Sequence, residues 1–298
     1  MKRIVLAMGA SLASLIIGGC ATQPLPYHNV SAANDIIEFA PGVVSTKEYF
    51  EINAVFNEAG DKVIFARCSD DFGTCAMMES KHKNGQWQKP ETLPFSGEYL
   101  DADPYFDQKF ELLYYISKRP IKKGGKETEN VNLWRVAHID GIWQTPEYMD
   151  KLSSQDMDLY PSITRNGDLY FPSFRDNKRQ MYVAKANGTG FDKPTPLPTE
   201  MFGKDAKIGD SVVLRDGNTI IFSMRRPDSM GKGDLYVSHK VNGLWTLAKS
   251  LGEKVNSADH EFTPIVSPDG QYLFFTRIEQ GKGNIYQISL DALSMPAP

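Results

Sequence analysis

The sequence has little cysteine, no excess of basic charge and none of the short motifs that mark common catalytic sites. Its 298 residues include three cysteines, and the net charge is -4 at pH 7. Without a basic face, the chain is a poor partner for nucleic acid. No second cysteine pair exists to complete a zinc site. His-Glu-x-x-His, Gly-x-Ser-x-Gly and dinucleotide fingerprints are also missing, so the sequence predicts no metal and no cofactor.

Long hydrophobic runs are missing too, and the single apolar stretch near the start is short. Lys2 and Arg3 precede this stretch, which ends at Ile17 and is followed by Gly18-Gly19-Cys20. A charged head, a short apolar segment and small residues are typical of a secretory signal and not of a membrane span. We therefore predict a signal peptide over residues 1–19 and a flexible tether over residues 20–35, where Pro and Asn recur.

The end of this segment, Leu15-Ile16-Ile17-Gly18-Gly19-Cys20, resembles a bacterial lipobox. The resemblance implies that Cys20 is lipidated and becomes the first residue of the mature protein. An ordinary signal peptide with an incidental cysteine is the alternative. Ala21, in place of an acidic residue, follows Cys20 and by resemblance to Gram-negative sorting favours the outer membrane. The expected location is a lipid anchor in the outer membrane of a Gram-negative bacterium, facing the periplasm.

A strand, a turn and a second strand recur five times along the chain. The fullest copy runs from Glu261 to Arg277 and contains the turn Ser267-Pro268-Asp269-Gly270. Proline fixes φ and glycine permits positive φ there, which suits a hairpin turn. Aromatic anchors of the second strands follow one another at steps of 50, 56, 51 and 53 residues, at Phe65, Tyr115, Phe171, Phe222 and Phe275. Self-similarity at this period indicates propeller blades or another repeat array.

Each repeat continues into a third and a fourth strand, which makes a four-stranded antiparallel blade. The third strands are anchored at Met78, Trp134, Tyr182, Tyr236 and Tyr286. The last repeat stops near Leu290 after three strands, so its sheet would keep an open edge. The segment 36–45 precedes the first repeat as a fourth strand would, and we predict that it pairs beside Tyr286 and closes the ring.

The predicted fold is therefore all-β, a five-bladed β-propeller over residues 36–293 with a tail at 294–298. We expect a monomer. The predicted blades cover residues 49–95, 100–153, 157–198, 207–252 and 259–290, with the N-terminal strand 36–45 completing the last.

The repeat resembles the TolB-type, WD-like propeller repeat of bacterial envelope proteins. The resemblance is carried by Ser267 to Gly270 with Phe275, and by Gly233-Asp234-Leu235-Tyr236 after Arg226. It spans about residues 36–290 and implies the fold. Because there are five units and no companion domain precedes them, the resemblance does not imply a role in the Tol-Pal system.

Cys68 and Cys75 lie in the loop between the second and third strands of the first repeat. A loop of this size between antiparallel strand ends brings two sulfurs together, and an oxidising periplasm favours a disulfide. Two free thiols beside Asp70 and Asp71, or a metal site, are the alternatives.

Charged residues recur where the first strands begin and the second strands end. The acids are Glu51, Asp101, Asp158 and Glu261, with Ile208 in the fourth repeat and Asp210 two residues on. The arginines are Arg67, Arg119, Arg175, Arg226 and Arg277. One interpretation is a brace that repeats because every blade needs it. The other is a polar ligand site at the channel mouth.

Departures from the repeat mark further candidates on the same face. His260 stands between Asp259 and Glu261, and the loop from Lys118 to Asn130 concentrates positive charge at Lys122 and Lys123. This loop is either simply solvated or lies over the channel mouth and holds acidic groups of a sugar or a protein. The candidate ligand-binding residues are Asp101, Asp158, Asp210, His260, Glu261, Arg119, Arg175, Arg226, Lys122 and Lys123.

The sequence supports two hypotheses about function. The favoured hypothesis is a non-enzymatic envelope lipoprotein, held at the membrane by its lipid, whose channel-mouth face binds a protein, peptide or glycan. The alternative is a carbohydrate-active, glycosidase-like enzyme that uses Glu51, Asp101, Asp158 and Glu261. Such chemistry needs one acid with a raised pKa, and we expect a neighbouring arginine to lower the pKa instead.

Overall fold

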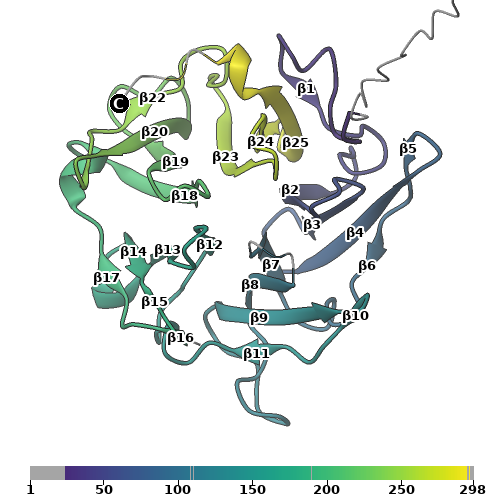
Figure 1. Cartoon of the computed structure of the whole chain (residues 1–298), viewed down its shortest axis with the longest axis vertical. Helices are drawn as coiled ribbons and strands as arrows, with labels where there is room; N and C mark the ends of the chain where they lie inside the picture. Colours follow the sequence, from purple (N-terminus) through teal and green to yellow (C-terminus); the bar gives the residue numbers. More distant parts are fainter. Residues whose placement is uncertain (1–23, 108, 110, 189, 294, 296–298) are drawn as a thin grey trace, which may run out of the picture.

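The computed structural model describes residues 24–293 and 295, apart from 108, 110 and 189. Within these residues the chain is all-β, and five antiparallel sheets surround a common axis (Figure 1). The five-bladed β-propeller predicted from the repeat is confirmed. The predicted signal peptide, Cys20 and most of the 294–298 tail lie outside the described residues. In the described part of the chain, no helix has the length and apolar character that a bilayer crossing requires.

The first strand of each blade lies nearest the axis and the last lies at the rim (Figure 1). The strands of blades 1 and 2 are β2 (Phe50–Phe56), β3 (Lys62–Cys68), β4 (Cys75–Lys83), β5 (Gln86–Trp87), β6 (Glu91–Thr92), β7 (Asp101–Phe106), β8 (Leu112–Ser117), β9 (Asn132–Ile139), β10 (Ile142–Trp143) and β11 (Glu147–Tyr148). Those of blade 3 are β12 (Ser162–Ile163), β13 (Leu169–Ser173), β14 (Gln180–Ala184), β15 (Ala186–Asn187), β16 (Gly190–Phe191) and β17 (Thr195–Pro196). Those of blades 4 and 5 are β18 (Lys207–Val213), β19 (Thr219–Arg225), β20 (Asp234–Val241), β21 (Leu244–Trp245), β22 (Lys249–Ser250), β23 (His260–Val266), β24 (Tyr272–Glu279), β25 (Lys282–Ser289) and β1 (Ile37–Glu38).

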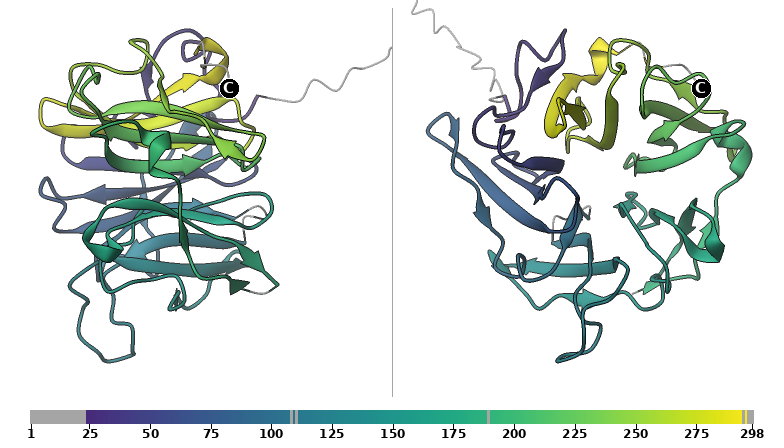
Figure 2. Two further views of the ribbon diagram at one scale, coloured as in Figure 1. Left: turned by 90° about the vertical axis from the view of Figure 1, so that its left-hand side faces the viewer. Right: turned by 180° about the vertical axis from the view of Figure 1, so that it is seen from behind.

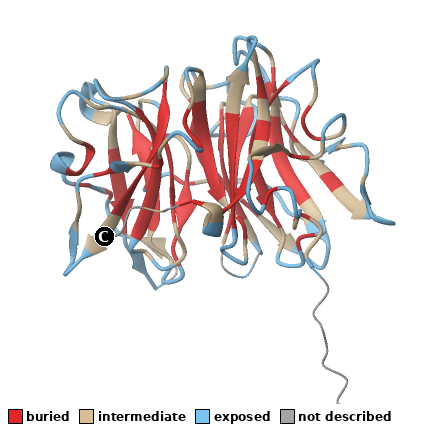
Figure 3. Ribbon diagram, turned by 90° about the horizontal axis from the view of Figure 1, so that it is seen from above, coloured by how far each residue is buried: buried red, intermediate tan, exposed pale blue. Residues whose placement is uncertain are grey.

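The second-strand and third-strand anchors predicted from the repeat are direct cross-strand partners in every blade. The pairs are Phe65 with Met78, Tyr115 with Trp134, Phe171 with Tyr182, Phe222 with Tyr236 and Phe275 with Tyr286. All five second-strand anchors are buried. Figure 3 shows the same burial along the middle of the sheets, with exposed residues gathered at their ends. Packing of these faces between neighbouring blades supplies the hydrophobic core.

The N-terminal segment closes the ring, as predicted. Strand β1 pairs antiparallel with β25, with Glu38 opposite Tyr286. The pairing strand is shorter than the predicted segment 36–45, because Ala40 and Gly42 take positive φ and turn the chain away from β25. Phe39 follows directly and packs its ring on Phe274 of blade 5 and on Phe56 of blade 1. The clasp is therefore a two-residue strand followed by an aromatic wedge between the first and last blades.

The flexible tether predicted over residues 20–35 is wrong from Pro24 onward. Tyr27 is 1% exposed and packs against Phe56 and Phe274, and Ala32 is fully buried. The carbonyl of Ala32 accepts a hydrogen bond from the amide of Ser289. The Pro and Asn content of the segment suggested flexibility, but a buried aromatic ring anchors it to the propeller.

The two faces of the ring differ in the connections that they carry. We call turn face the side with the hairpins between first and second strands, and loop face the side with the connections between second and third strands. The ring of Tyr27 lies against Gly60 in the β2–β3 turn, and His28 bonds Asp269 in the β23–β24 turn. The ordered N-terminal segment is therefore attached to the turn face of blades 1 and 5.

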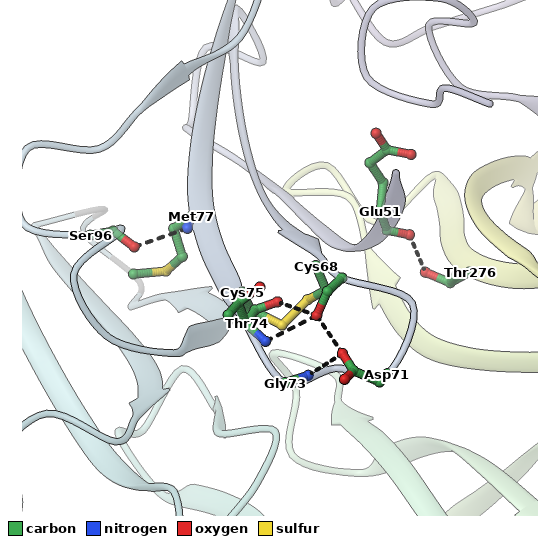
Figure 4. Close-up of a disulfide and its surroundings, with 10 residues drawn as sticks. Glu51, Cys68, Asp71, Gly73, Thr74, Cys75, Met77, Ser96 and Thr276 are labelled. Carbon is green, nitrogen blue, oxygen red and sulfur yellow. Dashed lines mark hydrogen bonds between the residues drawn. A yellow bond between two sulfur atoms is a disulfide. The ribbon is translucent and has the colours of Figure 1, made fainter. Parts of the chain in front are cut away.

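The predicted disulfide between Cys68 and Cys75 is present on the loop face of blade 1 (Figure 4). The two cysteines are paired residues of β3 and β4, at the point where the hairpin opens into its loop. Asp71 inside the loop accepts hydrogen bonds from Ser69 and from the amide of Gly73. The disulfide thus fixes a short loop that is already folded on itself.

Reduction of this disulfide is expected to lower the free energy of unfolding by about 2 kcal/mol, as loop-closure entropy gives for so short a loop. Denaturant unfolding of the oxidised and reduced protein measures the difference. The double variant Cys68→Ala/Cys75→Ala, which does not respond to reductant, is the control. An unchanged midpoint on reduction of the wild-type protein would contradict the prediction.

Candidate functional site

The four repeated acids lie at the loop-face ends of the first strands and are fully buried. Each accepts a hydrogen bond from an arginine of its own blade, and the pairs are Glu51 with Arg67 (3.1 Å), Asp101 with Arg119 (2.8 Å), Asp158 with Arg175 (2.8 Å) and Glu261 with Arg277 (2.8 Å). Each contact uses a single arginine nitrogen. In blades 2 and 3, where the acid is Asp, its second carboxylate oxygen accepts a hydrogen bond from a serine hydroxyl in the connection that enters the blade. Ser96 donates to Asp101 in this way, and Ser154 donates to Asp158. These are the contacts of the brace interpretation.

The residue opposite each acid on the second strand changes together with the acid. In blades 1 and 5 the acid is Glu, and the arginine stands directly opposite, as in Glu51 with Arg67. In blades 2 and 3 the acid is the shorter Asp and a serine stands opposite, Ser117 or Ser173. There the arginine comes two residues later and its Nε donates to that serine, as Arg175 does to Ser173 at 2.8 Å. The arginine therefore follows the second strand at two different spacings, and both spacings build the same brace.

The arginines also connect each blade to the chain that enters it. In blades 1 and 5 another nitrogen of the arginine donates to a carbonyl in the preceding connection, as Nη2 of Arg277 does to Val255 (2.8 Å). In blades 2 and 3 the Nη2 that bonds the acid also donates to such a carbonyl, as in Arg119 to Phe95 (3.0 Å). Each guanidinium also lies over an aromatic anchor, as Arg175 does over Phe171 at 5.1 Å. These stacking and hydrogen-bonding contacts suit the planar guanidinium and would be lost with lysine.

Blade 4 lacks this brace. Ile208 stands opposite Met224, so both members of the pair are apolar. Arg226 keeps its bond to a carbonyl, that of Ala248, but pairs with Asp228 in its own loop. The side chain of Asp228 is 63% exposed, whereas the four brace carboxylates are buried. In blade 4 the arginine that follows the second strand is thus paired with an exposed carboxylate, whereas in the other four blades its partner is buried.

The expectation that a neighbouring arginine lowers the pKa of these acids is confirmed for Glu51 and Asp101, but the net pKa of each is nevertheless raised. Burial raises the pKa of Glu51 and of Asp101, and the arginine offsets only part of that effect. Removing a carboxylate from water disfavours its charged form more strongly here than one guanidinium contact favours it. A raised pKa at these positions reflects burial in a brace.

Beyond the brace acids of blades 1, 2 and 5, and beyond Ile208 in blade 4, the first strand is irregular. The register between first and second strands slips in β2, β7, β18 and β23. Four residues, each two positions after a brace acid, take positive φ: Asn53, Asp103, Tyr160 and Thr263. Bulges re-aim side chains and leave an extra residue outside the ladder. The bulge residues are the groups that the repeat presents to the channel.

The equivalent position carries a carboxylate in two blades, Asp103 in blade 2 and Asp210, two residues after Ile208, in blade 4. Asp103 accepts a hydrogen bond from the amide of Tyr160 (3.3 Å), and Asp210 accepts one from the amide of Thr263 (3.0 Å). Each carboxylate therefore joins its blade to the bulge of the next. Asp210 also forms an ion pair with Arg179 at 3.3 Å. No ion pair of Asp103 is found in the part of the chain that the structure describes.

Burial and the nearby carboxylate of Asp210 raise the pKa of Asp103 well above its usual value. The pKa of Asp210 is raised as well, by burial, although Arg179 lowers it. The Tyr160 phenol lies with these two carboxylates, because a hydrogen bond between the phenol and Asp210 lowers the pKa of Asp210. Burial lowers the pKa of His260, so this imidazole is neutral at pH 7. His260 and Asp210, both predicted candidates, thus lie close to each other, while Asp103, Tyr160 and Arg179 were not predicted.

A cavity of about 320 Å³ opens on the loop face beside this channel cluster. Its walls are mostly apolar, and its polar groups are Asp103, Tyr160, Asn130 and, from the β8–β9 loop, Lys118 and Glu129. Apolar walls include Ile52, Leu100, Ala102, Ile116, Val131, Met157 and Leu159. None of the predicted ligand-binding residues lines this cavity. A larger groove of about 400 Å³, between blades 2 and 3, includes the hairpin turn Thr164–Gly167 and so belongs to the turn face.

The charged β8–β9 loop does not cover the channel mouth. Figures 1 and 2 show it extending outward beyond the rim of blade 2. Lys122 and Lys123 are exposed. Only the base of the loop, at Lys118, Glu129 and Asn130, reaches the cavity. Among the described residues, no group of three or more His, Cys, Asp or Glu side chains could hold a metal ion.

No family model and no curated protein sequence matches this chain. In fold it is similar to a putative TolB from Agrobacterium tumefaciens, with 14% identity, a TM-score of 0.53, and coverage of 82% of this chain and 78% of that one. It is similar to a Hadza microbial sialidase, with 11% identity, a TM-score of 0.52, and coverage of 86% and 68%. TolB from Acinetobacter baumannii shows 12% identity and a TM-score of 0.48 over 80% of this chain, which spans about half of that protein, 54%. At these identities the likeness concerns the fold alone, which is a TolB-like β-propeller.

Proposed function

We propose that the protein is a lipid-anchored envelope protein that binds a protein, peptide or glycan partner on its loop face. The observation that supports this most directly is the attachment of the N-terminal segment to the turn face through Tyr27. Pro24 comes four positions after Cys20, and an extended chain of that length reaches at most about 14 Å. A lipid on Cys20 would therefore hold the turn face near the membrane. The loop face, with its 320 Å³ cavity, would then point away from it.

Anchoring is tested by replacing Cys20. We expect wild-type protein in the membrane fraction, released by detergent but not by high salt, and Cys20→Ala in the soluble fraction. The double variant Cys68→Ala/Cys75→Ala is the matched control and should stay with the membrane. Membrane association of Cys20→Ala equal to that of the wild-type protein would refute the lipid anchor.

Partner binding is tested by placing a photo-crosslinking side chain on each face in living cells. Met157 is 37% exposed and lines the cavity, and Leu244 is 74% exposed beside the β20–β21 hairpin of the turn face. We expect a discrete adduct from position 157 and none from position 244. Adducts from position 244 alone would assign binding to the opposite face and overturn the proposal.

The second candidate is a carbohydrate-active enzyme, and one observation favours it. The four acids first considered for catalysis are engaged in braces, but Asp103 lines the cavity with a strongly raised pKa beside the Asp210 carboxylate. A carboxyl group whose pKa is raised by burial can act as a proton donor, and burial raises the pKa of both groups here. Assays with aryl glycosides test this function. Turnover that falls at least tenfold in Asp103→Asn would establish it, and turnover that the variant preserves would remove Asp103 from any catalytic role.

A further inference from the structure

The cavity on the loop face combines an apolar body with one deeply placed carboxylate. Side chains from blades 1, 2 and 3 form its walls, and Asp103 is the acid within it at 2% exposure. Ligand sites in proteins are typically apolar clefts of this size with a few polar groups that fix orientation. The shape and lining therefore suit a small apolar group with one polar end.

Asp103 differs from the other buried acids of the first strands in its partners. Glu51, Asp101, Asp158, Glu261 and Asp210 each have an arginine at ion-pair distance. Asp103 accepts one hydrogen bond, from a backbone amide at 3.3 Å, and among the described residues no cation lies within ion-pair distance of it. A buried carboxylate without a counter-charge is costly. Among these first-strand acids, Asp103 is the one without an arginine partner, and it lines the cavity together with Glu129 of the β8–β9 loop.

The surroundings of Asp103 do not supply the missing charge. Arg179 is already paired with Asp210, and His260 is neutral because burial lowers its pKa. Lys118 and Glu129 also line the cavity, and the described part of the chain shows no ion pair between Lys118 and Asp103. The carboxylates of Asp103 and Asp210 together thus face a single guanidinium. A charged Asp103 would therefore have no counter-ion of its own at the channel end of the cavity.

We propose that the cavity binds a protonated amine carried on an apolar body, with the ammonium group held by Asp103 beside Asp210. This inference rests on the proposed binding function and names the chemistry of its loop-face site. An ammonium donates charge-assisted hydrogen bonds to a carboxylate, and these are about twice as strong as neutral ones. The apolar body would lie against Leu100, Val131 and Leu159. The amine belongs either to a peptide, as an amino terminus or lysine, or to a free small molecule.

The test compares 2-phenylethylamine with its neutral analogue 2-phenylethanol by calorimetry at pH 7. We expect the amine to bind at least tenfold more tightly than the alcohol, and Asp103→Asn to weaken amine binding at least tenfold. Asp150→Asn, which removes an exposed carboxylate of blade 2, is the matched control and should bind as the wild-type protein does. Equal affinity for amine and alcohol, undetectable amine binding, or unchanged binding by Asp103→Asn would each overturn the proposal.

A second measurement separates loss of the site from loss of the fold. Because the folded-state pKa of Asp103 is raised, its charged form opposes folding increasingly as pH rises through that pKa. Asp103→Asn should therefore melt at or above the wild-type temperature at pH 7, and asparagine also accepts the positive φ at this position. Amine binding should release a proton from wild-type protein, seen as a buffer-dependent binding enthalpy, and none from the variant. Identical buffer dependence in both would contradict the assignment to Asp103.

Two further outcomes distinguish the sources of the amine and the two proposals. Phenylalanyl-glycine and its N-acetylated form make up a peptide arm: tighter binding of the free peptide than of 2-phenylethylamine assigns the site to a peptide terminus, and weaker binding assigns it to a small free amine. Amine binding without a crosslink at position 157 would support the cavity and refute the partner surface. A crosslink at position 157 without amine binding would support the partner surface and refute the amine site in the cavity.

Discussion

Replacing Asp158 with alanine is expected to lower the free energy of unfolding by about 3–5 kcal/mol, the usual effect of removing one partner from a buried ion pair. The variant leaves the Arg175 guanidinium, which is 17% exposed, without its carboxylate. It also leaves the hydroxyl of Ser173 and the amide of Ser154 without their acceptor. Urea unfolding of the purified protein measures the change.

The repeat supplies a control for this prediction. Asp228→Ala removes the exposed ion pair of blade 4, in which the carboxylate contacts Arg226 at 2.7 Å. Solvent screens exposed pairs, so this change should cost less than about 1 kcal/mol. The two variants differ mainly in the burial of the carboxylate that they remove. Equal losses in both would refute the brace as the source of blade stability.

Replacing Phe39 with alanine is expected to cost about 3–5 kcal/mol, as large-to-small changes of buried aromatic residues do. Phe39 is 3% exposed, and its ring lies 5.3 Å from that of Phe274 and 5.4 Å from that of Trp87. These partners belong to blades 5 and 1, so the cavity left behind falls at the closure of the ring. Chemical denaturation gives the stability change.

Hydrogen exchange locates the effect of this variant. The amide of Phe39 donates to the carbonyl of Ile285 in β25, and we expect faster exchange of amides in β1 and β25 than in blade 3. Val30→Ala, at a side chain that is 90% exposed in the same N-terminal segment, should change stability by less than about 0.5 kcal/mol. Uniformly faster exchange in all blades would show that Phe39 supports the core in general and not the closure.

Much of the fold could be read from the sequence because the repeat encodes it several times. A weak turn around residue 108 or a weak anchor at Met78 does not obscure a pattern that other copies repeat. The third-strand anchors, the closing strand and the disulfide partners followed from this pattern because strand pairing has a strict two-residue period. One misplaced residue would have put every anchor on the wrong face of its sheet.

The site was predictable only in part. The brace acids and arginines stood out because they recur, and recurrence is what a structural role produces. Asp103 stands two residues after Asp101, as Asp210 does after Ile208, and that matching offset is the signal that could have revealed it. Tyr160 stands at the same offset after Asp158, so the repeat could have revealed it as well. Arg179 gave no such signal, because its partner Asp210 comes from the next blade.

The sequence by itself determined the number of blades, the strand register, the closure by residues near Ile37 and the pairing of Cys68 with Cys75. All of these depend on local period and on contacts within one blade or between its immediate neighbours. The tertiary structure alone decided that Tyr27 holds the N-terminal segment on the turn face and that Asp103 reaches the cavity without a cation. These depend on how bulged first strands from different blades converge on the axis, and no spacing within a single repeat encodes that geometry.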